Sequence, residues 1–175
     1  MREFNQMLSA EIIAVTGGIL AGGILAFYKG VITAVPGLLV FLPGFLQLRG
    51  ALSGALSARV STALHLGTVK HLKNSPIIRG NFTATVILTV IASVLLSFFA
   101  YFISSLLGYS DATIIFVGIT AGIISGALMI PITFFLCFYV YKKGLDPDNV
   151  IGPYISTIGD VVCMASLILA VVIIA

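Results

Sequence analysis

Charged residues are scarce in this 175-residue sequence, where lysine, arginine, aspartate and glutamate together account for 9% of positions. A soluble domain usually carries about 25% charged residues, and the longest polar stretch here, 70–80, is too short to form one. Cysteine is scarce too, and Cys137 and Cys163 lack metal-ligand spacing, which predicts small, buried apolar side chains. These shortages exclude a soluble domain and predict a single transmembrane domain over residues 1–175.

The sequence contains long uncharged runs instead. About 20 apolar residues are enough to cross a bilayer as an α-helix. The runs occupy 12–28, 30–48, 80–110, 112–141 and, around one acid, 149–175. We therefore predict an all-α, multi-pass protein of the cell membrane, with five transmembrane helices embedded in the lipid bilayer.

The net charge of +3 indicates membrane topology and not nucleic-acid binding. If the N-terminus lies in the cytoplasm, five helices place the C-terminus outside, and Lys29 is then the only basic residue on the outer side. This bias follows the positive-inside rule. The basic residues assigned on or near the cytoplasmic side are Arg2, Arg49, Arg59, Lys70, Lys73, Arg79, Lys142 and Lys143.

Two prolines interrupt the second apolar run, at Pro36 and Pro43. Proline removes a backbone donor and kinks a helix, so we predict one long, broken second helix over 31–66. The alternative is a kinked span followed by an amphipathic interfacial helix. Small or hydroxyl side chains recur along its later half and are candidates to line a pore: Gly50, Ser53 and Ser57.

Glycines recur every four residues in two of the predicted helices. Gly18 and Gly22 form one such pair in the first helix, and Gly118, Gly122 and Gly126 continue the pattern in the fourth. This spacing lets helix backbones approach closely in lipid. We predict tight helix packing at both places.

Asp160 is the only charge between residues 149 and 175. A charge near the bilayer centre costs about 2.5–3.5 kcal/mol on the translocon scale, and such residues are usually functional. Pro153, Ser156 and Thr157 precede it at helical spacing, so the four side chains are predicted to share one face towards a water-filled cavity. The alternative is an Asp160 that is neutral, or paired with Arg49 or Arg59 inside the bundle.

The oxygen atoms of such a site favour a hard cation. Mg²⁺ is usually held through one or two carboxylates and keeps several of its waters, which makes Asp160, Thr157 and Ser156 candidate metal contacts. A homodimer with a two-fold axis supplies two Asp160 side chains to one ion. Three further acids are candidate contacts at the cytoplasmic mouth: Asp146, Asp148 and Glu11.

Two stretches resemble a known family. Asp146-Pro147, Gly152-Pro153, Thr157 and Asp160 look like the last helix of the MgtE-type magnesium transporters. Residues 43–50 and 57–62 are similar to the broken second helix of that family, and closest to its solute-carrier branch. The resemblance implies a homodimeric membrane domain with a central pore, in which Asp160 contacts hydrated Mg²⁺ and the second and fifth helices line the path.

The chain departs from that family in two respects. Ala51 stands where the family commonly has asparagine, so one polar pore contact is missing or supplied elsewhere. The large cytoplasmic regulatory domains of bacterial members have no counterpart in residues 1–175. We therefore expect any feedback to come from the membrane part or from a partner.

Other classes fit the sequence less well. No second acid lies inside a span to support an aspartyl protease, and no G-x-S-x-G motif supports a serine hydrolase, so we predict that the chain is not an enzyme. A proton-coupled transporter of a small solute, with Asp160 as the proton relay, is the main alternative. A purely structural subunit is the third possibility.

Overall fold

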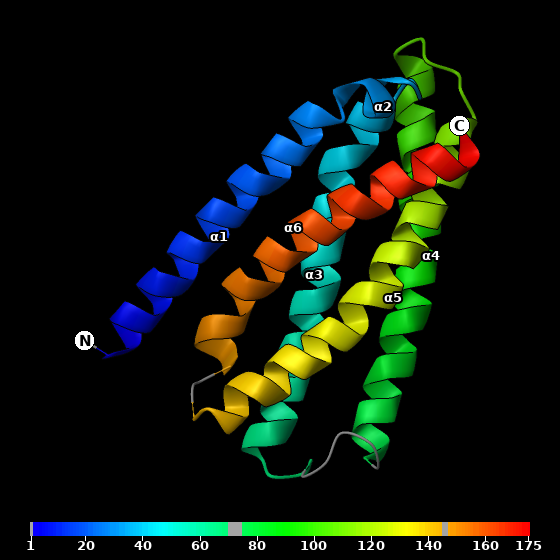
Figure 1. The fold of residues 1–175 in the computed structure, drawn as a ribbon. Coiled ribbons are helices and arrows are strands. Elements are labelled where there is room, and N and C mark those ends of the chain that lie inside the picture. Colours follow the sequence, from blue (N-terminus) through cyan, green and yellow to red (C-terminus); the bar gives the residue numbers. More distant parts are fainter. Residues whose placement is uncertain (1, 70–74, 145–146) are drawn as a thin grey trace.

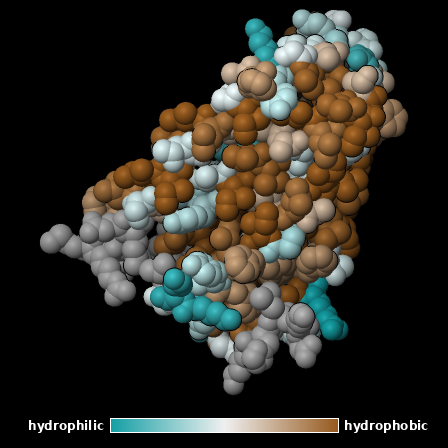
Figure 2. All heavy atoms as spheres, viewed as in Figure 1, coloured by the Kyte–Doolittle hydropathy of each residue, from teal (hydrophilic) through white to brown (hydrophobic). Residues whose placement is uncertain are grey.

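The computed structural model describes residues 2–69, 75–144 and 147–175, and every regular element in these ranges is helical. Five of the helices are long and apolar enough to cross a membrane, as predicted. Apolar side chains cover most of the flank shown in Figure 2, and hydrophilic ones gather at its two ends. The helices are α1 (Arg2–Phe27), α2 (Lys29–Thr33), α3 (Leu38–His65), α4 (Pro76–Leu106), α5 (Thr113–Lys142) and α6 (Pro147–Ile174) (Figure 1).

The predicted second helix is broken, but the break lies early. It separates the short α2 from α3 at residues 34–37, where Pro36 is followed by Gly37 with a φ of 88°. A residue before proline avoids the helical region, and glycine tolerates positive φ, so the two together end α2. Pro43 lies inside α3 without ending it, and α3 continues to His65 as one helix.

Helix α6 lies inside the bundle. It packs against α1, α3 and α5, while α4 covers α3 and α5 on the other side (Figure 1). Helix α1 packs only against α2 and α6 among the described helices. The central position of α6 surrounds Asp160 with several helices.

The glycines of α5 form the predicted tight contact. Gly118, Gly122 and Gly126 are buried, and a Cβ atom at each would overlap Ser97, Ser93 or Thr89 of α4. The expectation for α1 is wrong within this chain, because Gly18 and Gly22 have no neighbour within 4 Å of an added Cβ. The close approach in α1 occurs at Gly17, whose added Cβ would overlap Thr157 of α6.

Asp111 marks the start of α5. Its Oδ1 accepts a hydrogen bond of 2.9 Å from the backbone N–H of Thr113. The hydrogen bonds from Thr113 hold the pKa of the Asp111 carboxyl below its usual range. The Asp111 carboxylate is therefore explained by its hydrogen bond at the start of α5 and does not require a role in cation binding.

Candidate functional site

A polar layer divides the apolar core. One cluster of buried apolar residues includes Phe41, Phe45 and Leu167, and the other includes Leu56 and Met129. Between the clusters, each of three helices carries polar or glycine residues at the same level: Arg49 and Ser53 on α3, Gly122, Ser125 and Gly126 on α5, and Ser156 and Asp160 on α6. Polar groups are therefore concentrated midway along the bundle, where burial makes them most costly.

A cavity of about 180 Å³ opens in this layer between α3 and α6. It brings together three of the residues predicted from the sequence, Asp160, Ser156 and Gly50. The full lining is Pro43, Leu46, Gln47, Arg49, Gly50, Ile155, Ser156, Gly159 and Asp160. A liquid water molecule occupies about 30 Å³, so the cavity is large and polar enough to hold several.

Asp160 is half-buried on the wall of this cavity. Arg49 lines the same cavity, but its Nη2 donates to the carbonyl oxygen of Gly122 on α5, at 2.9 Å. Arg59, the other arginine considered as a partner, is exposed. Across residues 2–69, 75–144 and 147–175, Asp160 takes part in no ion pair, which leaves its carboxylate open to the cavity.

The structure places Arg49 in the middle of the bundle and not at a membrane surface. Its side chain is 2% exposed, on the turn of α3 that faces α5 and α6. The prediction that it belongs to the cytoplasmic basic residues is therefore wrong. Charge counting missed this because Arg49 follows directly after the apolar run 30–48, whereas α3 continues past it to His65.

Thr157 does not line the cavity. Its hydroxyl donates to the carbonyl oxygens of Pro153, at 3.0 Å, and of Ile13 on α1, at 3.3 Å. Consecutive residues of a helix lie about 100° apart, so Ser156 and Thr157 point in different directions. The predicted polar face is divided, with Ser156 and Asp160 towards α3 and Thr157 towards α1.

The remaining candidates also lie away from the cavity. Pro153 is half-buried one turn before it, and Ser53 and Ser57 are buried within the bundle, where the Cys137 thiol donates to the Ser57 hydroxyl at 3.6 Å. Glu11 is exposed on α1. Asp146 and the side chain of Asp148 fall outside the described residues.

The structure adds Gln47 and Arg49 to the site. Both line the cavity, and Gln47 is exposed on α3. One signal in the sequence indicates Gln47: with Pro43, Gly50 and Gly54 it follows the spacing i, i+4, i+7 and i+11, which places all four on one side of α3. No comparable pattern marks Arg49, whose contacts depend on α5 and α6.

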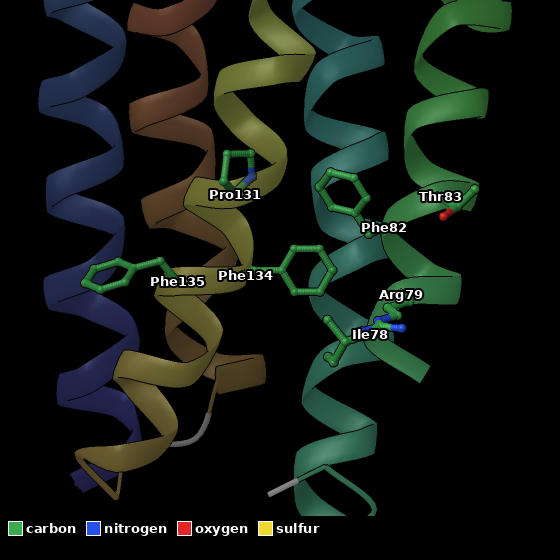
Figure 3. A pocket seen from close by; sticks show the side chains of 7 residues that line it. All are labelled: Ile78, Arg79, Phe82, Thr83, Pro131, Phe134 and Phe135. Carbon is green, nitrogen blue, oxygen red and sulfur yellow. The ribbon is translucent and has the colours of Figure 1, made fainter. Parts of the chain in front are cut away.

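A larger hollow, of about 750 Å³, lies on the flank between α4 and α5. Figure 3 shows Phe82 of α4 facing Phe134 of α5, and their ring centroids are 6.3 Å apart. Its lining is almost entirely apolar, with Arg79 as the only charged residue. A hollow with a basic residue and no acid is a poor place for a cation, so the smaller cavity at Asp160 is the better candidate for a cation site.

Metal clusters of the usual protein type are not found in the part of the chain that the structure describes. No group of three or more histidine, cysteine, aspartate or glutamate side chains could hold a metal ion there. One carboxylate with neighbouring hydroxyl and amide oxygens suits an ion that retains its water, as Mg²⁺ does.

Comparisons with known proteins agree with this chemistry. The family described as "MgtE: Divalent cation transporter" matches residues 42–170, which include all of α4 and α5, nearly all of α3, and α6 up to residue 170. The chain is also 28% identical to solute carrier family 41 member 2 of Gallus gallus over 177 residues, which cover 93% of this chain. The match spans only 30% of that relative. No solved structure matches.

Proposed function

Because the chain belongs to the MgtE family of divalent cation transporters, a family of multi-pass membrane proteins and not of enzymes, we propose that it conducts hydrated Mg²⁺ past Asp160. The observation that carries this proposal is an aspartate halfway along the bundle, open to a polar cavity and without an ion pair among the residues that the structure describes. A half-buried carboxylate without a partner is unfavourable in the middle of a membrane bundle. A passing cation supplies the missing charge.

The cavity lining supports a hydrated ion. The Asp160 carboxylate, the Ser156 hydroxyl and the Gln47 side-chain amide supply oxygen atoms on its wall. Mg²⁺ gives up its water reluctantly, and about 180 Å³ leaves space for an ion with part of its hydration shell. We propose that Asp160 and Ser156 contact the ion through this water, and that Thr157 positions α6 against α1.

The surface next to the cavity supports a homodimer. Pro43, Gln47, Gly50 and Gly54 are exposed along one side of α3. A glutamine facing lipid is unfavourable, and small residues let helices from two copies approach closely. A two-fold axis along this side of α3 would place two Asp160 carboxylates near one ion.

The cell membrane and the orientation with the N-terminus inside remain part of the proposal. The acids Glu11, Asp146 and Asp148 then lie near the cytoplasmic mouth, where negative charge would concentrate cations. The same orientation places the short loop at Asp111 outside. Glu11→Cys and Asp111→Cys test this orientation. A membrane-impermeant thiol reagent added outside the cell should label the cysteine at 111 and not the one at 11.

Magnesium flux into proteoliposomes tests the function directly. We expect an imposed Mg²⁺ gradient to drive uptake that a magnesium-sensitive dye reports inside the vesicles, without any proton gradient. In the alternative, Asp160 relays protons for a small solute. Solute uptake that depends on a proton gradient and is indifferent to Mg²⁺ would support that alternative and contradict the magnesium proposal.

Ser156 and Thr157 provide a matched pair of neighbouring hydroxyls. Ser156→Ala removes an oxygen from the cavity wall, and we expect about a two- to tenfold weaker Mg²⁺ affinity, the usual range for one hydrogen bond. Thr157→Val removes a hydroxyl that bonds to Pro153 and Ile13, so the affinity should stay within about twofold. Isothermal titration of purified protein in nanodiscs measures both. The reverse order of effects would show that Thr157 contacts the ion.

A further inference from the structure

Arg49 is a buried cation beside a proposed cation site. It lines the cavity that contains Asp160, and its side chain is only 2% exposed. A positive charge on this wall repels any metal ion that enters. This arrangement is unexpected for a site that serves only to attract cations.

The position of the guanidinium is fixed by α5. Its Nη2 donates to the Gly122 carbonyl oxygen at 2.9 Å, and Nη1 would lie 3.1 Å from a Cβ atom at Gly126. The missing side chain at Gly126 thus leaves space that the guanidinium occupies. The side chain is therefore held on the α5 side of the cavity, with Asp160 on the α6 side.

The hydrogen bonding of Arg49 is incomplete. A guanidinium has five N–H donors, yet Nε has no hydrogen-bond partner in the described part of the chain. No ion pair involves Arg49 within the described ranges, and the Cys163 thiol lies beside it. An arginine kept only for stability is normally paired and fully hydrogen-bonded when buried, so packing alone does not account for this one.

We propose that Arg49 lowers the affinity of the cavity for its cation, so that a bound ion can leave. The inference rests on the proposed function, because it takes Asp160 as the cation site. Conduction requires an ion to bind strongly enough to enter and weakly enough to depart. The Asp160 carboxylate, joined by a second one in the proposed homodimer, holds a divalent ion strongly in a cavity sheltered from bulk water. A fixed positive charge nearby offsets part of that attraction.

Neutralising Arg49 should therefore tighten binding. We expect the Kd for Mg²⁺ to fall by at least about tenfold in Arg49→Gln and in Arg49→Met, because the repulsion acts through a medium of low dielectric constant. Coulomb energy scales with ionic charge, so the affinity for Na⁺ should rise only by about threefold, the square root of the Mg²⁺ change. Isothermal titration with Mg²⁺, and competition by Na⁺, measure the two values in nanodiscs.

Two further variants serve as controls, one for charge and one for position. Arg49→Lys keeps the positive charge, so its Mg²⁺ affinity should remain near that of the wild type. Arg59→Gln removes a positive charge from an exposed site on the same helix, and its affinity should also be unchanged. Arg49→Met tests the same point if Arg49→Gln does not fold, since apolar replacement of a buried charge is often tolerated.

A gain of affinity separates this role from a structural one, because a damaged protein binds less and not more. Unchanged or weaker Mg²⁺ binding in the folded neutral variants would overturn the proposal, as would an equal gain in Arg59→Gln. Asp160→Asn distinguishes an error in the proposed cation site from an error in the role of Arg49. If it binds Mg²⁺ like the wild type, the proposed site is wrong; if it loses binding while the neutral Arg49 variants match the wild type, only the role of Arg49 is wrong.

Discussion

Replacing Asp160 by asparagine is expected to reduce Mg²⁺ flux by more than about a hundredfold, equivalent to about 2.7 kcal/mol. Asparagine keeps the size and one oxygen of the side chain but removes its charge. A unit charge at 4 Å contributes about 4 kcal/mol per opposing unit charge at the effective dielectric constant of a protein surface. Intervening water reduces this figure, while the double charge of Mg²⁺ and the second protomer increase it.

Proteoliposomes measure the effect at equal amounts of reconstituted protein. The matched control is Asp111→Asn, because Asp111 is an acid whose hydrogen bond to Thr113 explains its charge. Its flux should stay within about twofold of the wild type. Undiminished flux in Asp160→Asn would reject Asp160 as the acid of the pore, whatever the control shows.

Gly122→Ala is expected to give the largest loss of stability. The added methyl group would overlap the Oγ and Cβ atoms of Ser93 on α4. Overpacking of this kind costs about 1–3 kcal/mol, which corresponds to a fall in Tm of roughly 2–12 °C for a domain of this size. Thermal unfolding in detergent, followed by circular dichroism, measures the change.

Two variants show whether the overlap is the cause. Gly22→Ala adds the same methyl group to α1, where no atom lies within 4 Å of it, so its Tm should be unchanged or slightly higher. Ser93→Gly, added to Gly122→Ala, removes both atoms that the methyl group would meet and should restore part of the lost stability. A Tm in Gly122→Ala equal to that of the wild type would contradict the packing seen between α4 and α5.

The two experiments address different properties of one polar layer. Asp160 is expected to affect transport more than folding, because its carboxylate takes part in no ion pair within the described residues. Gly122 is expected to affect folding first, and transport as well, because its carbonyl oxygen holds the Arg49 guanidinium. If Asp160→Asn loses flux but keeps its stability while Gly122→Ala loses stability, the residue that binds the cation is distinguished from the packing that holds the site in place.

Much of the fold follows from local sequence. The five long helices were predicted because each apolar run approaches or exceeds the about 20 residues that cross a bilayer, and a helix in lipid must satisfy its own backbone hydrogen bonds. The break in the second segment was predicted from its two prolines, but only one of them is at the break. Pro36 acts together with the positive φ of Gly37, whereas α3 passes through Pro43 without ending.

The site was predicted less completely than the helices. Asp160, Ser156 and Gly50 were selected from the sequence, and they do line one cavity. Thr157 was placed on the same face, but the side of α6 on which it lies is occupied by α1 at Gly17. Helical spacing tells which residues are neighbours on one helix, but not where the boundary between two packing partners falls.

Residue composition and order alone determined that this chain has five helices long and apolar enough to cross a membrane, and one acid in the middle of the last of them. These properties depend on the transfer of each segment from water to lipid, which is nearly independent of the other segments. Only the tertiary structure decided that Arg49 is inside the bundle, that Gly122 accepts its hydrogen bond, and that Ser156 and Thr157 face different neighbours. The rotation of a helix about its axis is set by the side chains packed against it, and these come from parts of the chain far away in sequence.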